Sequence, residues 1–190
     1  MRELTPLAIA VLALLNEQPM HAYEMYQLLL ARHQDRMLKL RLGSLYHTVE
    51  RLAGHGLIRV TGTERAGNRP ERTTYAITPA GTSALDARIR TGIEKYEYEY
   101  PLFPVVLSEA HNLEAEDAVA GLRRRVEQLQ AAVEEVEAII AEATARGVPE
   151  EYWIVADFQR AQLVSERDWL TALIERIESE DLAWSHRKNK

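Results

Sequence analysis

The sequence predicts a mainly α-helical protein with one small β-hairpin, divided into an N-terminal domain and a C-terminal domain of long helices. Short apolar segments with helical spacing fill the first 54 residues, two alternating segments follow, and two long amphipathic segments come after residue 113. Charge divides the chain in the same way. Residues 1–90 carry 12 Lys and Arg against 8 Asp and Glu, whereas residues 91–190 carry 11 against 21. A basic half and an acidic half indicate two functions within one chain.

The composition is that of a globular protein. Of 190 residues 46% are hydrophobic, and no apolar run approaches the 18 residues of a membrane span. The apolar segment Leu7–Leu15 has the length of a signal peptide, but Glu3 and Pro6 spoil the basic region that should precede it. The absence of Cys excludes disulfides and thiolate metal sites. We therefore expect a cytoplasmic protein with no membrane span.

Two short helices are predicted at the start. Thr5 before Pro6 is a helix-start signal, with Thr5 as N-cap and Pro6 in the first turn. The helix that follows, to about Asn16, is apolar on nearly all sides and should be buried. A second helix is expected from about His21 to His33.

A third helix is predicted over residues 43–54, with Ser44 as its N-cap and glycines at its end. Apolar residues at Leu45, Val49 and Leu52 share one side. The other side is polar and carries Ser44, His47, Glu50 and Arg51, and Tyr46 lies near it. Such a helix fits the major groove of DNA, although an ordinary solvated helix has the same appearance.

A hairpin should follow, with strands at residues 57–64 and 71–77. Its turn and the start of its second strand carry Arg65, Asn68, Arg69 and Arg72. Three helices and a hairpin with a basic tip make up a winged helix-turn-helix domain, in which the wing contacts phosphate or the minor groove. The alternative is a merely hydrophilic loop.

The C-terminal half should begin with a helix at Thr78-Pro79 and contain two long helices, at about residues 114–146 and 150–181. This divides the chain into a DNA-binding domain (1–90), a linker (91–113) and a helical dimerisation domain (114–190). The two long helices carry more apolar surface than they can bury against each other, which favours a homodimer over packing on the first domain.

Enzymatic and metal-binding functions are not indicated. The sequence has no H-E-x-x-H, no phosphate-binding glycine loop and no G-x-S-x-G. Pairs such as His21/Glu24 and His47/Glu50 are isolated, and we expect neither catalytic residues nor a metal or other cofactor.

Several motifs together resemble the PadR family of bacterial transcription regulators. They are AYEMYQLL (residues 22–29), GSLYHTVERLAGHGLI (43–58) and RTTYAITPAG (72–81). His21-Ala22-Tyr23 departs from the His-Gly-Tyr common in the family. The resemblance implies a winged helix-turn-helix domain with a helical dimerisation region, and some members of the family bind phenolic acids or drug-like aromatics.

The expected function is that of a homodimeric regulator, acting as a repressor, that binds double-stranded DNA at a palindromic operator. The expected DNA-binding residues are Lys39, Arg41, Ser44, Tyr46, His47, Arg51, Arg65, Asn68, Arg69 and Arg72. Aromatic residues that could line a pocket for a small aromatic effector are Tyr96, Tyr100, Phe103, Trp153 and Trp169. The alternative, which is favoured for any one of them, is packing in the core or in the dimer. The rival hypothesis is a winged-helix adaptor that binds a protein partner through the same surfaces.

Overall fold

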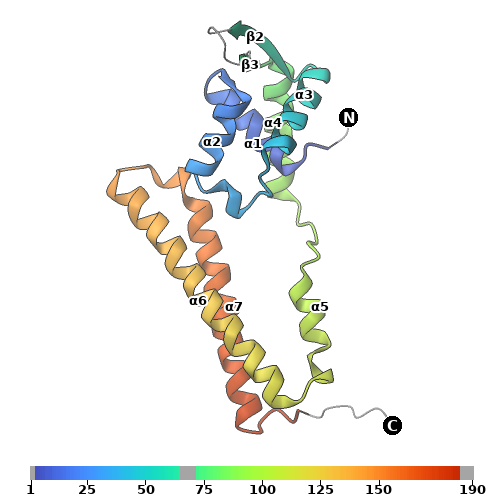
Figure 1. Ribbon diagram of the computed structural model, residues 1–190, viewed down its shortest axis with the longest axis vertical. Coiled ribbons are helices and arrows are strands. Elements are labelled where there is room, and N and C mark those ends of the chain that lie inside the picture. Colours follow the sequence, from blue (N-terminus) through green and yellow to red (C-terminus); the bar gives the residue numbers. More distant parts are fainter. Residues whose placement is uncertain (1–2, 65–71, 185–190) are drawn as a thin grey trace. The chain divides into compact units, whose positions relative to one another are not determined.

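The computed structural model describes residues 3–64 and 72–184, and the chain forms two compact units, Met1–Tyr98 and Glu99–Lys190 (Figure 1). The first unit contains four α-helices, a 3-10 turn and three strands within the described residues. The helical elements are α1 (Pro6–Glu17), α2 (Ala22–Ala31), η1 (Gln34–Arg36), α3 (Leu42–Gly54) and α4 (Pro79–Glu94). Each predicted helix of this half is confirmed, with ends that differ by one or two residues.

Sequence signals explain the ends of these helices. Thr5 accepts a hydrogen bond from the Ala8 N–H and caps α1, and Thr78 accepts one from the Gly81 N–H and caps α4. The expected glycine stop of α3 is Gly56, whose φ is +70°. Its N–H donates to the Ala53 carbonyl and the Leu57 N–H to the Leu52 carbonyl, the paired bonds of a Schellman motif.

The predicted N-cap at Ser44 is wrong. Helix α3 begins two residues earlier, at Leu42, and its N-cap residue is Arg41, which makes no side-chain capping bond. Ser44 lies within the first turn, where its carbonyl accepts from the Thr48 hydroxyl (2.8 Å). A cap contributes only about 1 kcal/mol, so a helix held by its buried side can begin without one.

The wing strands are β2 (Ile58–Glu64) and β3 (Arg72–Ile77), paired antiparallel with an irregularity between Val60 and Gly62. A third strand, β1 (Met20–His21), pairs with the other edge of β3 and gives the order β1-β3-β2. The sequence analysis missed β1, because two residues are too few to show an alternating pattern. The His21 Nδ1 and the Thr74 hydroxyl, 3.1 Å apart, join these two strands through their side chains.

One apolar core holds the first unit together. It is built from α1, α2 and α3, with contributions from the start of β2 and from Leu85 of α4. Its most deeply buried members are Val11, Leu12, Met25, Leu29 and Leu45, each fully inaccessible to solvent. This core fixes α3 through its apolar side and leaves the opposite side of the helix outside.

The Glu17–Arg32 pair joins the ends of α1 and α2 at the surface. The Arg32 guanidinium donates to both carboxylate oxygens (2.6 and 2.8 Å), and this bonding lowers the pKa of Glu17. The pair therefore stabilises the fold above the ordinary carboxyl pKa and loses its effect as the pH falls through the lowered value. Both side chains are about half exposed, so the contribution is at most about 1 kcal/mol.

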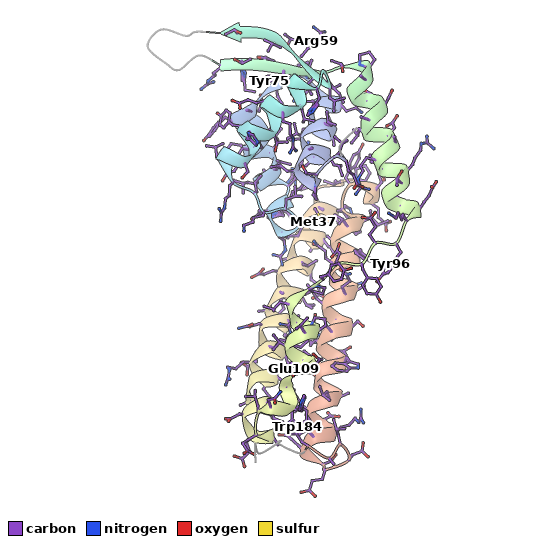
Figure 2. All side chains as sticks on the ribbon, turned by 90° about the vertical axis from the view of Figure 1, so that its right-hand side faces the viewer. Met37, Arg59, Tyr75, Tyr96, Glu109 and Trp184 are labelled. Carbon is purple, nitrogen blue, oxygen red and sulfur yellow. The ribbon has the colours of Figure 1, made fainter. Side chains whose placement is uncertain are left out.

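The second unit is a hairpin of two long helices, preceded along the chain by a short helix. Its elements are α5 (Leu102–Ser108), η2 (Ala110–Asn112), α6 (Ala115–Ala145), η3 (Glu150–Tyr152) and α7 (Ile154–Glu178). Helices α6 and α7 lie side by side in Figures 1 and 2, and they bury Leu122, Leu129, Leu170 and Ile174 between them. The predicted amphipathic character of residues 114–146 is confirmed. Apolar residues spaced by three or four along α6 are buried or half-buried: Leu122, Val126, Leu129, Val133, Val136 and Ile140.

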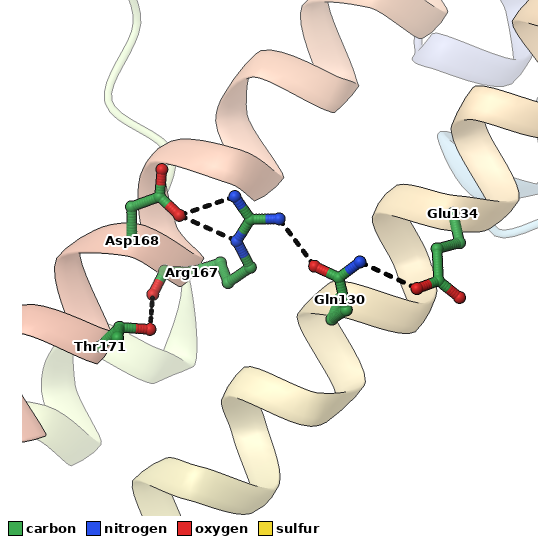
Figure 3. Close-up of polar contacts among 5 residues, drawn as sticks. All are labelled: Gln130, Glu134, Arg167, Asp168 and Thr171. Atoms are coloured by element: carbon green, nitrogen blue, oxygen red, sulfur yellow. Dashed lines mark hydrogen bonds and ion pairs between the residues drawn. The ribbon is translucent and has the colours of Figure 1, made fainter.

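Polar side chains fix the register of α6 against α7. The Arg167 guanidinium donates to the Gln130 amide oxygen (2.7 Å) and is paired with Asp168 (Figure 3). Arg125 forms a second bridge between the helices, with Glu166 at 2.6 Å. Both arginines are largely covered, so these bonds are less screened than those of an exposed pair.

Candidate nucleic-acid interface

The outer face of α3 carries the first group of predicted contact residues. Ser44, Tyr46 and His47 are all exposed, and 44% of Tyr46 is open to solvent. Leu45, Val49 and Leu52 point the other way, into the core. The core thus holds a rigid helix whose first two turns present a hydroxyl, a phenol and an imidazole, side chains that donate to and accept from base edges.

Cationic side chains lie at the N-terminal end of this helix. Lys39 and Arg41 belong to the segment between η1 and α3, and both are exposed. Arg41, the N-cap residue, makes no side-chain hydrogen bond to the N–H groups of the first turn of α3. Backbone donors, the helix dipole and two cations together favour an anion such as a DNA phosphate at this position.

Arg51 lies farther along the same helix and is half-buried. It follows His47 by four residues, so the two side chains are neighbours on one face of α3. Its Nη2 donates to the Thr5 hydroxyl at 3.2 Å, which turns the guanidinium toward the start of α1. A DNA contact of Arg51 stays a prediction.

The wing supplies a further pair of arginines. Arg72 is exposed at the start of β3, and Arg59 is exposed on β2 (Figure 2). Arg59 was not among the predicted contacts, although the alternation of Leu57, Ile58, Arg59 and Val60 was visible in the sequence. The predicted wing residues Arg65, Asn68 and Arg69 lie outside the described residues.

The predicted effector aromatics are divided by the structure. Phe103 and Trp169 line one cavity of about 690 Å³ between α5, α6 and α7. Trp153 lines another, where its indole N–H donates to the Val148 carbonyl (3.1 Å). Tyr96 and Tyr100 line neither of these cavities and are 82% and 92% exposed.

The larger cavity combines aromatic walls with one cation. The Arg125 guanidinium carbon lies 3.5 Å from the centre of the Phe103 ring, and Arg125 is also paired with Glu166. Phe158 and Trp169 of α7 complete the aromatic lining and are 60% and 55% exposed. An open, mostly apolar hollow of this size is suited to a flat organic molecule.

Residues 3–64 and 72–184 contain no group of three metal-binding side chains placed to hold an ion. Within the same ranges, none of the helices has both the length and the apolar character needed to cross a membrane.

Comparison with known proteins matches residues 11–87 to the transcriptional regulator PadR-like family. The fold is shared with Bacillus subtilis PadR in complex with operator DNA, at 15% identity and a TM-score of 0.75, covering 91% of this chain and 99% of that one. It is also shared with a PadR-like transcriptional regulator of Bacillus cereus, at 16% identity and a TM-score of 0.70, covering 92% of this chain and 99% of that one. The fold is shared as well with B. subtilis PadR in complex with p-coumaric acid, at 13% identity and a TM-score of 0.74. That match covers 90% of this chain and 98% of that one. No curated protein sequence matches the chain.

Proposed function

We propose that this chain is a PadR-like transcriptional regulator that binds a specific operator in double-stranded DNA as a homodimer and represses transcription there, because residues 11–87 match that family. The family is one of regulators, not enzymes. The observation that carries the proposal is the exposed polar face of α3 with cations at its N-terminal end. Lys39, Arg41, Ser44, Tyr46 and His47 make up this surface.

In this proposal α3 enters the major groove. A helix with its side chains is about 10–12 Å across, and the groove is about 12 Å wide. Ser44 and His47 then face base edges, while Lys39 and Arg41 reach the flanking phosphates. Arg59 and Arg72 of the wing are placed to contact the neighbouring backbone, and Arg65, Asn68 and Arg69 remain proposed contacts of the wing tip.

Homodimer formation is supported by apolar surface that the single chain leaves open. Helix α7 exposes Ile154, Phe158 and Trp169, and α5 exposes Leu102 and Val105, each by more than half. Large apolar side chains gathered on two neighbouring helices mark an interaction surface. A second copy of the chain covers them in our proposal, and its two α3 helices then meet half-sites of a palindromic operator about 34 Å apart.

A small aromatic effector is the proposed signal, and the Phe103–Trp169 cavity is its proposed site. The p-coumaric acid complex of B. subtilis PadR, a protein of the same fold, supports an aromatic ligand. The fluorescence of Trp169 tests this, with Trp169→Phe as the reference that removes its signal. We expect p-coumarate to quench the wild-type signal and Phe103→Ala to weaken binding about tenfold. Quenching unchanged by Phe103→Ala would exclude the cavity.

Alanine variants of the α3 surface test the DNA-binding proposal. We expect His47→Ala to weaken the free energy of binding to the preferred duplex by about 1–3 kcal/mol and to change binding to a scrambled duplex little. The reason is that a base contact carries sequence information. Lys39→Ala should weaken both complexes and reduce the slope of log K against log salt by about one, because a phosphate contact is lost. Binding is measured by fluorescence anisotropy at several salt concentrations.

The control is Arg124→Ala, which removes an exposed arginine from α6, in the second unit. It should leave both the affinity and the salt slope unchanged. If Arg124→Ala reduced the slope as much as Lys39→Ala does, the effect of Lys39 would be one of net charge and not of a phosphate contact.

A further inference from the structure

A further cavity, distinct from the proposed effector site, lies within the first unit. It has a volume of about 360 Å³ and is lined by the start of α1, the last turns of α3, the middle of α4 and Leu57. Aliphatic side chains form much of its wall, including Leu4, Leu52 and Ala84. Its polar lining contains two guanidinium groups, Arg51 and Arg88, and a single carboxylate, Glu3.

Arg88 brings one guanidinium to this cavity. Its Nε is buried and, among the described residues, is the side-chain atom left without a hydrogen-bond partner. The charged end of Arg88 meets Glu3 at 3.3 Å, a long contact to a carboxylate that is 64% exposed. An exposed carboxylate at this distance compensates the charge of Arg88 only weakly.

Arg51 brings a second guanidinium to the same cavity. Its bond to the Thr5 hydroxyl holds it at the N-terminal end of α1, where the helix dipole adds partial positive charge. His55 lies nearby, and its Nδ1 is 2.7 Å from the Arg51 carbonyl oxygen. Together Arg51, Arg88 and Glu3 leave the cavity with one uncompensated positive charge.

We propose that this cavity binds a small monocarboxylate with an apolar body. A carboxylate supplies acceptor oxygens for the ends of the Arg51 and Arg88 side chains, and it matches guanidinium geometry with paired hydrogen bonds. A single negative charge balances the excess of the lining. The aliphatic wall and a volume near the lower end of the usual ligand-pocket range favour a short hydrocarbon chain over an inorganic anion.

Calorimetric titration of the full chain with hexanoate tests the proposal, with hexanamide and inorganic phosphate as comparisons. We expect hexanoate to bind at least about tenfold more tightly than either, because hexanamide lacks the charge and phosphate lacks the apolar body. Arg88→Gln should weaken hexanoate binding about tenfold or more. Glu3→Gln should tighten it, because the competing carboxylate is removed. Arg90→Gln, an exposed arginine of the same helix, should change nothing.

A second readout locates the site without any variant at Arg88. The NMR signal of the His55 ring should shift on addition of hexanoate, while that of His111, an exposed histidine of the second unit, should not. No binding of hexanoate, equal binding of phosphate, an affinity unchanged in Arg88→Gln, or a stationary His55 signal would each overturn the proposal. These measurements follow the ligand directly, so they do not depend on DNA binding.

Discussion

Gly81→Ala is expected to destabilise the first unit by more than about 4 kcal/mol, enough to unfold a marginally stable domain. A Cβ at Gly81 would lie 2.1 Å from the Leu57 carbonyl oxygen, 3.0 Å from the Leu57 carbonyl carbon and 2.8 Å from the Ile77 Cγ1. The first two atoms belong to the backbone and cannot rotate away. Relief of the clash requires α4 to move off the start of β2.

Movement of α4 breaks further bonds at this junction. The Leu57 carbonyl accepts from the Thr78 N–H (3.0 Å) and the Thr78 hydroxyl (3.1 Å), and the same hydroxyl oxygen accepts from the Gly81 N–H. The cap of α4 and the hydrogen bonds between Thr78 and Leu57 would therefore be lost together. The expected cost exceeds the usual 1–3 kcal/mol of overpacking because a rigid backbone is the obstacle.

Urea denaturation followed by circular dichroism measures this effect. The matched control is Gly43→Ala in α3, where an added Cβ meets nothing within 4 Å. Gly43→Ala should leave stability equal or raise it by up to about 1 kcal/mol, since alanine is the better helix former. If Gly81→Ala denatured at the same urea concentration as wild type, the packing of α4 against Leu57 described above would be incorrect.

Phe158→Glu is expected to turn the proposed dimer into a monomer and to lower operator affinity by about a hundredfold or more. A glutamate on the exposed apolar surface of α7 would be buried unpaired on association, which costs several kcal/mol. Loss of the second DNA-binding domain also removes the avidity of bivalent binding, which amounts to about 10²–10⁴. Phe158 is 60% exposed in the single chain, so folding of the monomer should be retained.

Sedimentation velocity gives the oligomeric state, and anisotropy gives the affinity. Gln128→Glu, which places the same charge on an exposed position of α6, is the control and should remain dimeric. A Phe158→Glu variant that sedimented as a dimer would mean that α7 does not form the interface. A monomeric wild-type protein would contradict the dimer itself.

The sequence predicts this fold wherever the determining interactions are local. Thr5-Pro6 and Thr78-Pro79 marked the starts of α1 and α4 because a cap and a first-turn proline act within four residues. Gly56 marked the end of α3 for the same reason. The apolar periodicity of α6 identified its buried seam, since one face of a helix is determined by spacing alone.

Predictions failed or remained incomplete where distant residues decide. Strand β1 exists only through its pairing with β3, more than fifty residues away. Ser44 matched the chemistry of an N-cap, yet α3 starts at Leu42. The bond from Arg51 to Thr5, 46 residues earlier, could not be predicted from the sequence around Arg51.

The aromatic residues show the same limit. Aromatic composition alone could not tell Phe103 and Trp169, which share a cavity, from Tyr96 and Tyr100, which do not line it. Their separation depends on how α5 packs against α6 and α7. Similarly, nothing local in the sequence indicates that Arg88 lies with Arg51 beside one cavity.

The central claim is that this protein recognises a particular DNA sequence. Its most direct test is salt-dependent binding of the purified protein to the duplex upstream of its own gene, compared with a scrambled duplex of equal length. We expect a preference of about a thousandfold or more for the native duplex, with a steep negative salt slope. Equal, weak binding to both duplexes would contradict recognition of this operator and favour a winged-helix adaptor that binds a protein partner.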